Sequence, residues 1–457
     1  MTTSRRKFIK NVGAGSALLT AGSLGAGSLV TSCNSGSGKS GFTPLRPESE
    51  IYIPDLPDKA IDGKPVRAAL VGCGSRGTGA AFNFLDAADN VSIVALAEMF
   101  PDRLNSCRNL LSERKGVTVP DEKCFLGFDA YKQACDLPEV DVVLIASHSC
   151  FHPEHTKYAI DKGKHVFIEK PAAIDSVGYR TFMMSIRQAK AQGLNVMSGA
   201  QRHYQRSYVE SYRMIQAGYI GKILSGVVTW NVGNENHISR RPEWTDTEFM
   251  LRTFFNWNWI NGDQVNNLLI HWIDVFVWFS HLKPVQVSAY GSRVHRKAGN
   301  VYDNFSMDFE FENGARLYGM VRRMDGCHNV EGAIIQGEKG TWYSEDSSII
   351  DLNGNLVWKY DNEAAREKYQ NHNSFVLEHV DLINHIRKGT VIDTAEVLGI
   401  SSMACTMARE SAYSGKICTW DDLTVSGLDM MPAEFASGQF GNMDMKKYET
   451  VPLPGIG

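Results

Sequence analysis

The sequence has little of what would place it in several large protein classes. Its nine cysteines form no C-x-x-C pair and no regular spacing, so neither a zinc site nor a disulfide framework is predicted. The net charge of −4 and the lack of a long basic run outside the extreme N-terminus argue against a nucleic-acid partner. At 457 residues, 43% hydrophobic and 21% charged, the chain has an ordinary globular composition with room for two or three domains.

No long hydrophobic run of the kind that spans a membrane follows the N-terminus. The stretch "SRRKFIK" (residues 4–10) carries twin arginines, and residues 11–30 are apolar but interrupted by glycine and serine. The pattern resembles a twin-arginine export signal, and "LVTSC" resembles a lipobox ending at Cys33. Residues 1–33 are therefore predicted to direct export to the periplasm, with membrane attachment only through a lipid on Cys33. The alternative is a disordered basic leader.

The segment that follows, residues 34–64, is rich in serine, glycine and proline and is predicted to be a linker. Residues 65–200 then alternate short apolar runs with helical patterns. The runs "VRAALV", "NVSIVALAE", "EVDVVLIAS", "HVFIEK" and "LNVMSGA" are the expected strands. Strands that alternate with helices predict right-handed crossovers and a doubly wound parallel sheet of the Rossmann type.

A glycine-rich turn, G-x-G-x-x-G, follows the first of these runs. Gly72 permits a tight turn, Gly74 lets backbone N–H groups approach a pyrophosphate, and Gly77 allows close helix-to-strand packing. Such a motif alone is often only a turn, but here a strand precedes it and a helix follows. Glu98 ends the second run, where its carboxylate would bind the adenosine ribose and repel a 2′-phosphate. NAD is therefore the predicted cofactor, with Arg76 able to weaken the exclusion of NADP.

The stretch "KHVFIEKPAAI" (residues 164–174) ends an apolar run with two charged residues, Glu169 and Lys170. In an open α/β sheet the carboxyl ends of the strands face the ligand crevice. A partly desolvated amine there can donate a hydrogen bond to a substrate oxygen and assist a proton transfer. The alternative is a solvated lysine at the end of a strand, paired with Glu169.

These motifs, with "IASHSCFHPEHTKYAIDKGKHVFIEKP" and "SGAQRHYQ", resemble the Gfo/Idh/MocA oxidoreductase family over residues 65–420. The resemblance implies a catalytic Lys170 followed by a cis peptide bond. It also implies a nicotinamide-side loop, although "SHSCFH" keeps only part of the usual T-P-N-x-x-H pattern. The expected cofactor-binding residues are Gly72, Gly74, Ser75, Arg76, Gly77, Glu98, Arg103, Ser147, Ser149, His152, Glu169 and Lys170.

A second domain is predicted over residues 201–360. Its alternating apolar positions and the Asn313-Gly314 turn favour antiparallel strands. The fold class is thus an N-terminal Rossmann sheet plus a C-terminal α+β domain with an open-faced, mostly antiparallel sheet. Residues 361–457 are expected to supply helices and a tail that pack back on the core. By the resemblance, the open sheet often forms a dimer contact, which predicts a homo-oligomer.

A helical stretch, "VNNLLIHWIDVFVWF", places His271 and Asp274 three residues apart on one face. A lone histidine in such a position is more often a core residue. The family motif H-x-x-D instead implies that His271 exchanges a proton with the substrate, and Asp274 is expected to fix its imidazole. The family usually has a carboxylate four residues earlier. Here that residue is Asn267, whose amide can position a sugar hydroxyl but cannot take its proton.

Tryptophan and asparagine side chains around residues 230–259 are of the kind that bind carbohydrate. Trp257, Arg202 and His203 are expected to line the substrate cleft with Asn267 and Asp274. The alternative for the tryptophans is a place in the core.

These observations predict an NAD-dependent oxidoreductase that moves hydride at a ring carbon, C3 being favoured, of a sugar or glycoside. Since no pool of free NAD exists outside the cytoplasm, an exported enzyme is expected to retain its cofactor in a redox-neutral cycle. Three alternatives stay open: a glycosidase that works by oxidation and elimination, a dehydrogenase with exchangeable NAD, and a non-catalytic glycan-binding lipoprotein.

Overall fold

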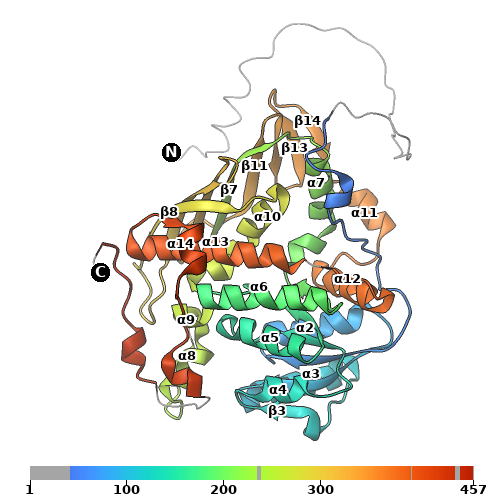
Figure 1. Cartoon of the computed structure of the whole chain (residues 1–457), viewed down its shortest axis with the longest axis vertical. Helices are drawn as coiled ribbons and strands as arrows, with labels where there is room; N and C mark the ends of the chain where they lie inside the picture. Colours follow the sequence, from blue (N-terminus) through green and yellow to red (C-terminus); the bar gives the residue numbers. More distant parts are fainter. Residues whose placement is uncertain (1–41, 234–237, 393, 438–442, 456–457) are drawn as a thin grey trace. The chain divides into compact units, whose positions relative to one another are not determined.

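The computed structural model describes residues 42–233, 238–392, 394–437 and 443–455. The predicted export signal and Cys33 lie outside these residues. Contacts group Phe42–Gly457 into one compact unit, which contains two β-sheets (Figure 1). None of the helices in the described ranges combines the length and the hydropathy that crossing a bilayer requires.

The first sheet has six parallel strands in the order β3-β2-β1-β4-β5-β6. Its strands are β1 (Val66–Val71), β2 (Val91–Glu98), β3 (Cys124–Leu126), β4 (Val142–Ile145), β5 (His165–Ile168) and β6 (Val196–Ser198). The helices between them are α2 (Ser75–Ala87), α3 (Pro101–Lys115), α4 (Ala130–Cys135), α5 (His152–Asp161) and α6 (Ser176–Ala191). The strand order reverses between β1 and β4, and ligands bind outside the carboxyl ends of the strands at such a point.

Strand burial explains why these short runs are so apolar. All four residues of β4 are buried, as are the last three of β5. A parallel sheet covered by helices on both faces removes most side chains of its central strands from water, so its strands need no polar alternation. The alternation of strands and helices in the sequence therefore predicted this Rossmann sheet correctly.

The second sheet has nine strands in the order β14-β13-β12-β11-β7-β10-β9-β8-β15. They are β7 (Ile223–Val232), β8 (Pro284–Ser292), β9 (Asn304–Phe311), β10 (Arg316–Arg323), β11 (Val330–Gly337), β12 (Gly340–Tyr343), β13 (Ser348–Asp351), β14 (Leu356–Lys359) and β15 (Cys418–Thr419). Only β7 and β10 pair in parallel among its neighbouring strands in the described chain. The predicted mostly antiparallel sheet is thus confirmed.

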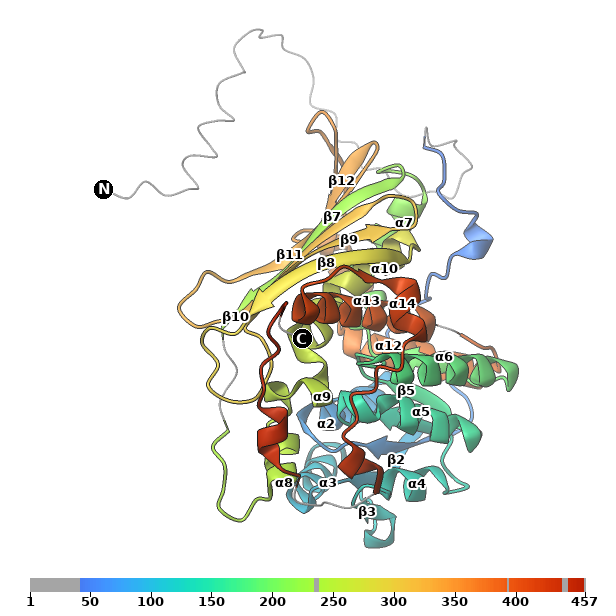
Figure 2. The same cartoon turned by 60° about the vertical axis from the view of Figure 1, so that its left-hand side comes forward.

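One face of this sheet packs against helices and the other is exposed (Figure 2). In β10, Leu317 and Val321 are buried, whereas Tyr318 and Met320 between them are 45% and 39% exposed. Helix α10 (Ile270–Ser280) packs against β7, and α13 (Ala395–Ser414) packs against β8. The same α13 contacts α6 of the first sheet, so it joins the two sheets into one core.

The remaining helices are short or lie at the edge of this core. They are α7 (Arg206–Gln216), α8 (Asp246–Arg252), α9 (Asn258–Asn261), α11 (Asn362–Lys368), α12 (Ser374–Lys388) and α14 (Trp420–Val425). Helix α12 packs against α2, next to the glycine-rich turn.

Residues 42–64 differ from the predicted linker, because they pack along α7 and α12. The backbone N–H of Leu45 donates to the carbonyl of Gln216 at 2.8 Å. The Tyr52 hydroxyl donates to the Asp381 carboxylate at 2.8 Å, and Asp58 pairs with Arg206 at 3.3 Å. The serine, glycine and proline content of this stretch carries no information about such side-chain contacts.

Candidate active site

The glycine-rich turn has the conformation that the sequence predicted. Gly72 has φ +95°, and a Cβ atom there would lie 2.5 Å from the carbonyl oxygen of Ala146. A Cβ on Gly77 would lie 1.8 Å from the carbonyl oxygen of Gly72. Gly74 instead faces open space, with no atom within 4 Å of its Cβ position. The turn therefore leaves the N-terminus of α2 accessible to an anion, which fits the pyrophosphate of a dinucleotide.

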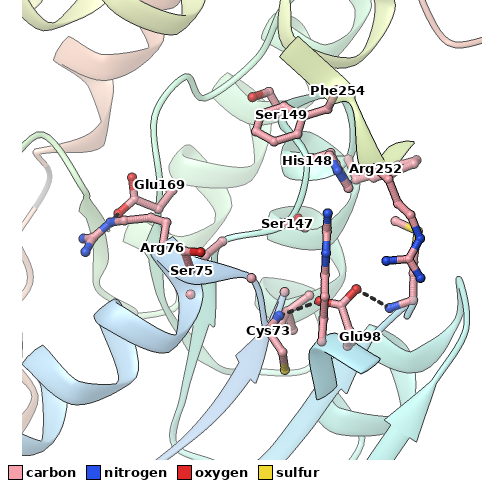
Figure 3. A pocket seen from close by; sticks show the side chains of 18 of the residues that line it. Cys73, Ser75, Arg76, Glu98, Ser147, His148, Ser149, Glu169, Arg252 and Phe254 are labelled. Atoms are coloured by element: carbon pink, nitrogen blue, oxygen red, sulfur yellow. Dashed lines mark hydrogen bonds and ion pairs between the residues drawn. The ribbon is translucent and has the colours of Figure 1, made fainter. Parts of the chain in front are cut away.

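Glu98 lies at the end of β2 beside this turn, and backbone N–H groups hold its carboxylate (Figure 3). One oxygen accepts from Cys73 at 2.6 Å, and the other accepts from Met99 at 2.7 Å and Phe100 at 3.1 Å. These three donors fix the carboxylate at the cleft wall. Its remaining lone pair is available to a ribose hydroxyl.

The two arginines predicted for the cofactor site lie in different places. Arg103 lines the cleft near Glu98, with its guanidinium 4.9 Å from the centre of the Phe100 ring, and burial lowers its pKa. Arg76 lies on the other side of the pocket, where it pairs with Glu169 and, at 3.2 Å, with Glu378 (Figure 3). Arg76 is therefore not placed to receive a 2′-phosphate beside Glu98, contrary to the sequence-based expectation.

The loop after β4 carries Ser147, Ser149 and His152, and all three line the cleft. His152 is 1% exposed, and its two ring nitrogens face carbonyl oxygens of Pro171 at 2.7 Å and Ser147 at 3.0 Å. Its position ties the loop to the Lys170–Pro171 segment. The hydroxyl of Ser147 in turn contacts Nδ1 of His155 at 3.0 Å.

Lys170 follows β5 and precedes Pro171 through a cis peptide bond. Its ammonium group donates a hydrogen bond to the backbone carbonyl of Asn267 at 2.7 Å. Glu169 pairs with Arg76, so the alternative in which Lys170 forms an ion pair with Glu169 is not what the structure contains. Burial lowers the pKa of Lys170 to about 8. An amine with this pKa is suited to donate or exchange a proton near neutral pH.

The segment before α10 forms a π-helical turn, Val265–Leu269. Such turns are rare and often occur at functional sites. This one directs the backbone carbonyl of Asn267 to Lys170. Asn267 is half-buried and also lines the cleft.

His271 begins the next turn and lines a small pocket together with Lys170, Arg202 and Asp274. The structure thus brings Lys170 and His271 together. The His271 ring lies 5.2 Å from that of Trp230, and no hydrogen bond joins it to another residue of the described chain. Burial, together with the charges of Lys170 and Arg202, lowers the pKa of His271 well below its ordinary value. The imidazole is therefore neutral and can accept a proton.

Asp274 does not orient His271, so that sequence-based expectation was wrong. Its carboxylate contacts Nε2 of His203 at 2.6 Å and accepts a hydrogen bond from Ser401 at 3.1 Å. A spacing of three residues places two side chains on one helical face, but it does not decide which neighbour each one contacts. His203 is 5% exposed and stacks on Trp278.

Trp257 is also not a substrate-binding residue in this structure, because its side chain is fully buried. Its indole N–H donates to the hydroxyl of Thr253 at 3.1 Å, and the ring belongs to a second hydrophobic cluster. Arg202 does reach the small pocket. It donates to Glu331 at 2.9 Å and lies 3.8 Å from the centre of the Trp272 ring.

The cleft residues that were not predicted include Arg252 and Phe254 (Figure 3). These two come from the stretch "EFMLRTFFNW" (residues 248–257), which contains none of the sequence motifs that indicated the cofactor site. Nothing in the sequence indicated that this stretch reaches the first sheet.

The large cleft is continuous and has a volume of about 1610 Å³. It extends from the glycine-rich turn past Glu98 and Ser147 to Lys170 and Asn267. This is enough for a dinucleotide and a further ligand, since sites for drug-sized ligands occupy about 300–1,000 Å³.

Comparison with known proteins agrees with this arrangement. Residues 66–199 match the model of an oxidoreductase family with an NAD-binding Rossmann fold, and residues 208–343 match the GFO/IDH/MocA C-terminal domain. The two matches together span more than half of the chain.

Among curated proteins, glycosyl hydrolase family 109 protein 1 of Bacteroides fragilis is 32% identical over 132 residues, 29% of this chain. Glycosyl hydrolase family 109 protein 4 of Phocaeicola vulgatus is 36% identical over 133 residues, 29% of this chain. The chain spans only about a quarter of the length of these relatives, 27% and 25%.

Solved structures share the fold at low identity. Scyllo-inositol dehydrogenase of Lactobacillus casei, solved with bound NAD(H) and scyllo-inositol, has a TM-score of 0.59 at 19% identity and covers 78% of this chain and 100% of its own. Aldose-aldose oxidoreductase of Caulobacter crescentus has a TM-score of 0.60 at 18% identity, covering 78% of this chain and 99% of its own. The chain belongs to the Gfo/Idh/MocA family of oxidoreductases, and its first sheet forms the NAD-binding Rossmann domain of that family.

Proposed function

We propose that this protein is an NAD-dependent oxidoreductase that moves hydride at a ring carbon of a sugar or glycoside. The observation that carries the proposal is the meeting of Lys170 and His271 at one small pocket, with Lys170 also lining the large cleft. Bound NAD would supply the hydride acceptor, held by the glycine-rich turn and Glu98.

Each residue has a distinct role in this chemistry. The neutral imidazole of His271 accepts the proton of the substrate hydroxyl as the carbon–hydrogen bond breaks. The ammonium group of Lys170 donates a hydrogen bond to the same oxygen, at a position set by the Asn267 carbonyl. The Asn267 amide hydrogen-bonds a neighbouring hydroxyl but takes no proton.

The redox cycle is proposed to be neutral, with the cofactor retained and the hydride returned to the sugar. The twin-arginine pattern supports this, because a protein exported to the periplasm and attached through a lipid on Cys33 has no free NAD to exchange. We place the oxidation at C3, where the resulting carbonyl acidifies the proton on C2. The exposed face of the second sheet is the proposed surface for a homo-oligomer.

A glycosidase is the second candidate. Loss of the C2 proton allows the group on C1 to leave with its bonding electrons as a C1–C2 double bond forms. Water then adds across this bond, with its hydroxyl at C1 and a proton at C2, and the hydride and a proton return to the C3 carbonyl. The names of the family 109 glycosyl hydrolases among the relatives favour this candidate.

Two measurements test the proposal. Mass spectrometry of the native protein should detect bound NAD, and incubation with glycosides in D₂O should place deuterium at C2. Lys170→Ala and His271→Ala should each slow this exchange by about 10²–10⁴-fold and leave the bound NAD in place.

The controls separate the alternatives. A glycoside that exchanges and also loses its C1 substituent indicates a glycosidase. An empty protein that turns over only with added NAD contradicts retention, and glycan binding without any exchange would support a non-catalytic protein.

A further inference from the structure

A segment of the second domain reaches the first domain at the end of the cleft near Glu98. We call residues 246–256, which comprise α8 and a short turn to Asn256, the bridge segment. Figure 3 shows its Arg252 and Phe254 beside His148, across the pocket from Arg76 and Glu169. The bridge segment thus belongs to the same side of the pocket as Glu98.

Arg252 ties the bridge segment to one wall of the cleft. Its guanidinium donates two hydrogen bonds to the carboxylate of Asp102, at 2.8 and 3.0 Å, in the first turn of α3. It also lies 4.1 Å from the centre of the Phe100 ring and bonds Glu248 of its own helix at 2.8 Å. Phe100 and Asp102 are two and four residues after Glu98, so Arg252 contacts the segment that follows the carboxylate predicted to hold the adenosine ribose.

His148 ties the bridge segment to the loop after β4, a strand that lies on the other side of β1 from β2. This residue belongs to the loop after β4, and its Nε2 lies 2.8 Å from the carbonyl oxygen of Leu251. A carbonyl can only accept, so Nε2 carries the proton and donates it. Burial lowers the pKa of His148 to about 3, which leaves the imidazole neutral and the hydrogen bond unchanged near neutral pH. Adjacent residues, Leu251 and Arg252, are therefore attached to the segments that follow β4 and β2, the two strands that flank β1.

The C-terminal tail holds the bridge segment from outside. The backbone N–H of Met443 donates to the Thr247 hydroxyl, and that of Met445 donates to Asp246, both at 3.2 Å. The ring of Phe435 in the same tail lies 5.0 Å from that of Phe128 and 5.7 Å from that of Phe151, both in the first domain.

We propose that the bridge segment is a latch that retains NAD, with Arg252 as its main positioning residue. This inference rests on the proposed function only in that NAD is the bound cofactor. A dinucleotide bound between Glu98 and the loop after β4 would lie beneath the bridge segment, which is attached both to α3 and to that loop. Release of its adenosine half requires the contacts of Arg252 with Asp102 to break, and this makes exchange slow compared with turnover.

The test measures exchange of bound NAD in the full chain. The purified protein is mixed with excess isotopically labelled NAD, and the labelled fraction is followed by native mass spectrometry. Arg252→Gln and Asp102→Asn are each expected to speed the exchange by about tenfold, as loss of a bidentate charged pair predicts. The double variant should be no faster than either single variant, because both remove one interaction.

Arg316→Gln is the matched control. Arg316 also contacts two carboxylates, Asp308 and Glu310, but on the exposed face of the second sheet. Its exchange rate should equal that of the parent. If Arg252→Gln fails to fold, Asp102→Asn tests the latch alone, since the Asp102 side chain is 63% exposed and its loss leaves the core intact.

Failure of the latch and failure of the proposed function give different results. Unchanged exchange in both variants, or complete exchange of the parent within one turnover, overturns the latch even if sugars are oxidised. A parent that holds NAD tightly and releases it faster on Arg252→Gln supports the latch even if no sugar reacts.

Discussion

At the residue scale, Lys170 donates its hydrogen bond to a backbone carbonyl, that of Asn267, and not to a carboxylate. With its pKa lowered to about 8, the ammonium form predominates below pH 8 and is lost above it. If Lys170 donates a hydrogen bond to the substrate, kcat/KM should fall as the pH rises through about 8.

Glu169→Gln should shift this decline to lower pH. The carboxylate of Glu169 raises the pKa of Lys170, so its removal favours the neutral amine. The measurement is the pH profile of kcat/KM, with Glu363→Gln on α11 as an exposed control. A profile that does not move would show that Lys170 does not titrate in catalysis.

The sequence indicated two residues, Lys170 and His271, that the structure brings together at one small pocket, because a strand end and a helical motif each have a defined place in this fold. It did not indicate the partner of Asp274 or the burial of Trp257. Both depend on residues distant in the chain, His203 and Ser401 for Asp274 and the second hydrophobic cluster for Trp257. Arg252 could not be found either, since no local pattern reports that α8 contacts α3.

At the scale of elements, two glycines of the glycine-rich turn are expected to affect different properties. Gly77 affects the stability of the fold, and Gly74 affects the binding of NAD. A methyl group on Gly77 would collide with the Gly72 carbonyl, whereas one on Gly74 would enter the open cleft. Gly77→Ala should therefore lower the free energy of unfolding by about 3 kcal/mol or more. Gly74→Ala should leave the stability of the NAD-free protein nearly unchanged but reduce the bound NAD.

Chemical denaturation of the NAD-free variants measures the change in the free energy of unfolding. Mass spectrometry of the variants as purified measures their content of bound NAD. Equal NAD content in Gly74→Ala and the parent would contradict the proposed place of the pyrophosphate.

Element types were predictable where the apolar runs were strong, as in five of the six parallel strands; the sixth, β3, has only three residues and no such run. The π-helical turn Val265–Leu269 was not predictable, because its composition is compatible with an ordinary helix. Residues 42–64 were misjudged for the opposite reason: a composition typical of linkers conceals contacts such as that of Tyr52 with Asp381.

At the scale of the whole molecule, residues of both sheets belong to one hydrophobic cluster that α13 connects. The described domains are therefore expected to unfold together, in one calorimetric transition. NAD at 100 times its Kd should stabilise the folded state by about 2.7 kcal/mol, which corresponds to a rise in Tm of about 3 °C.

Differential scanning calorimetry of the NAD-free protein with and without added NAD checks this expectation. Two transitions, of which only one responds to NAD, would show that the sheets unfold independently.

The hydrogen bond from Lys170 to the peptide oxygen of residue 267 has a consequence for substitutions at that residue. Because the backbone anchors the lysine, the side chain at position 267 can vary between amide and carboxylate while the lysine keeps its place. A substitution of the side chain at position 267 is therefore expected to change the lining of the cleft without displacing Lys170.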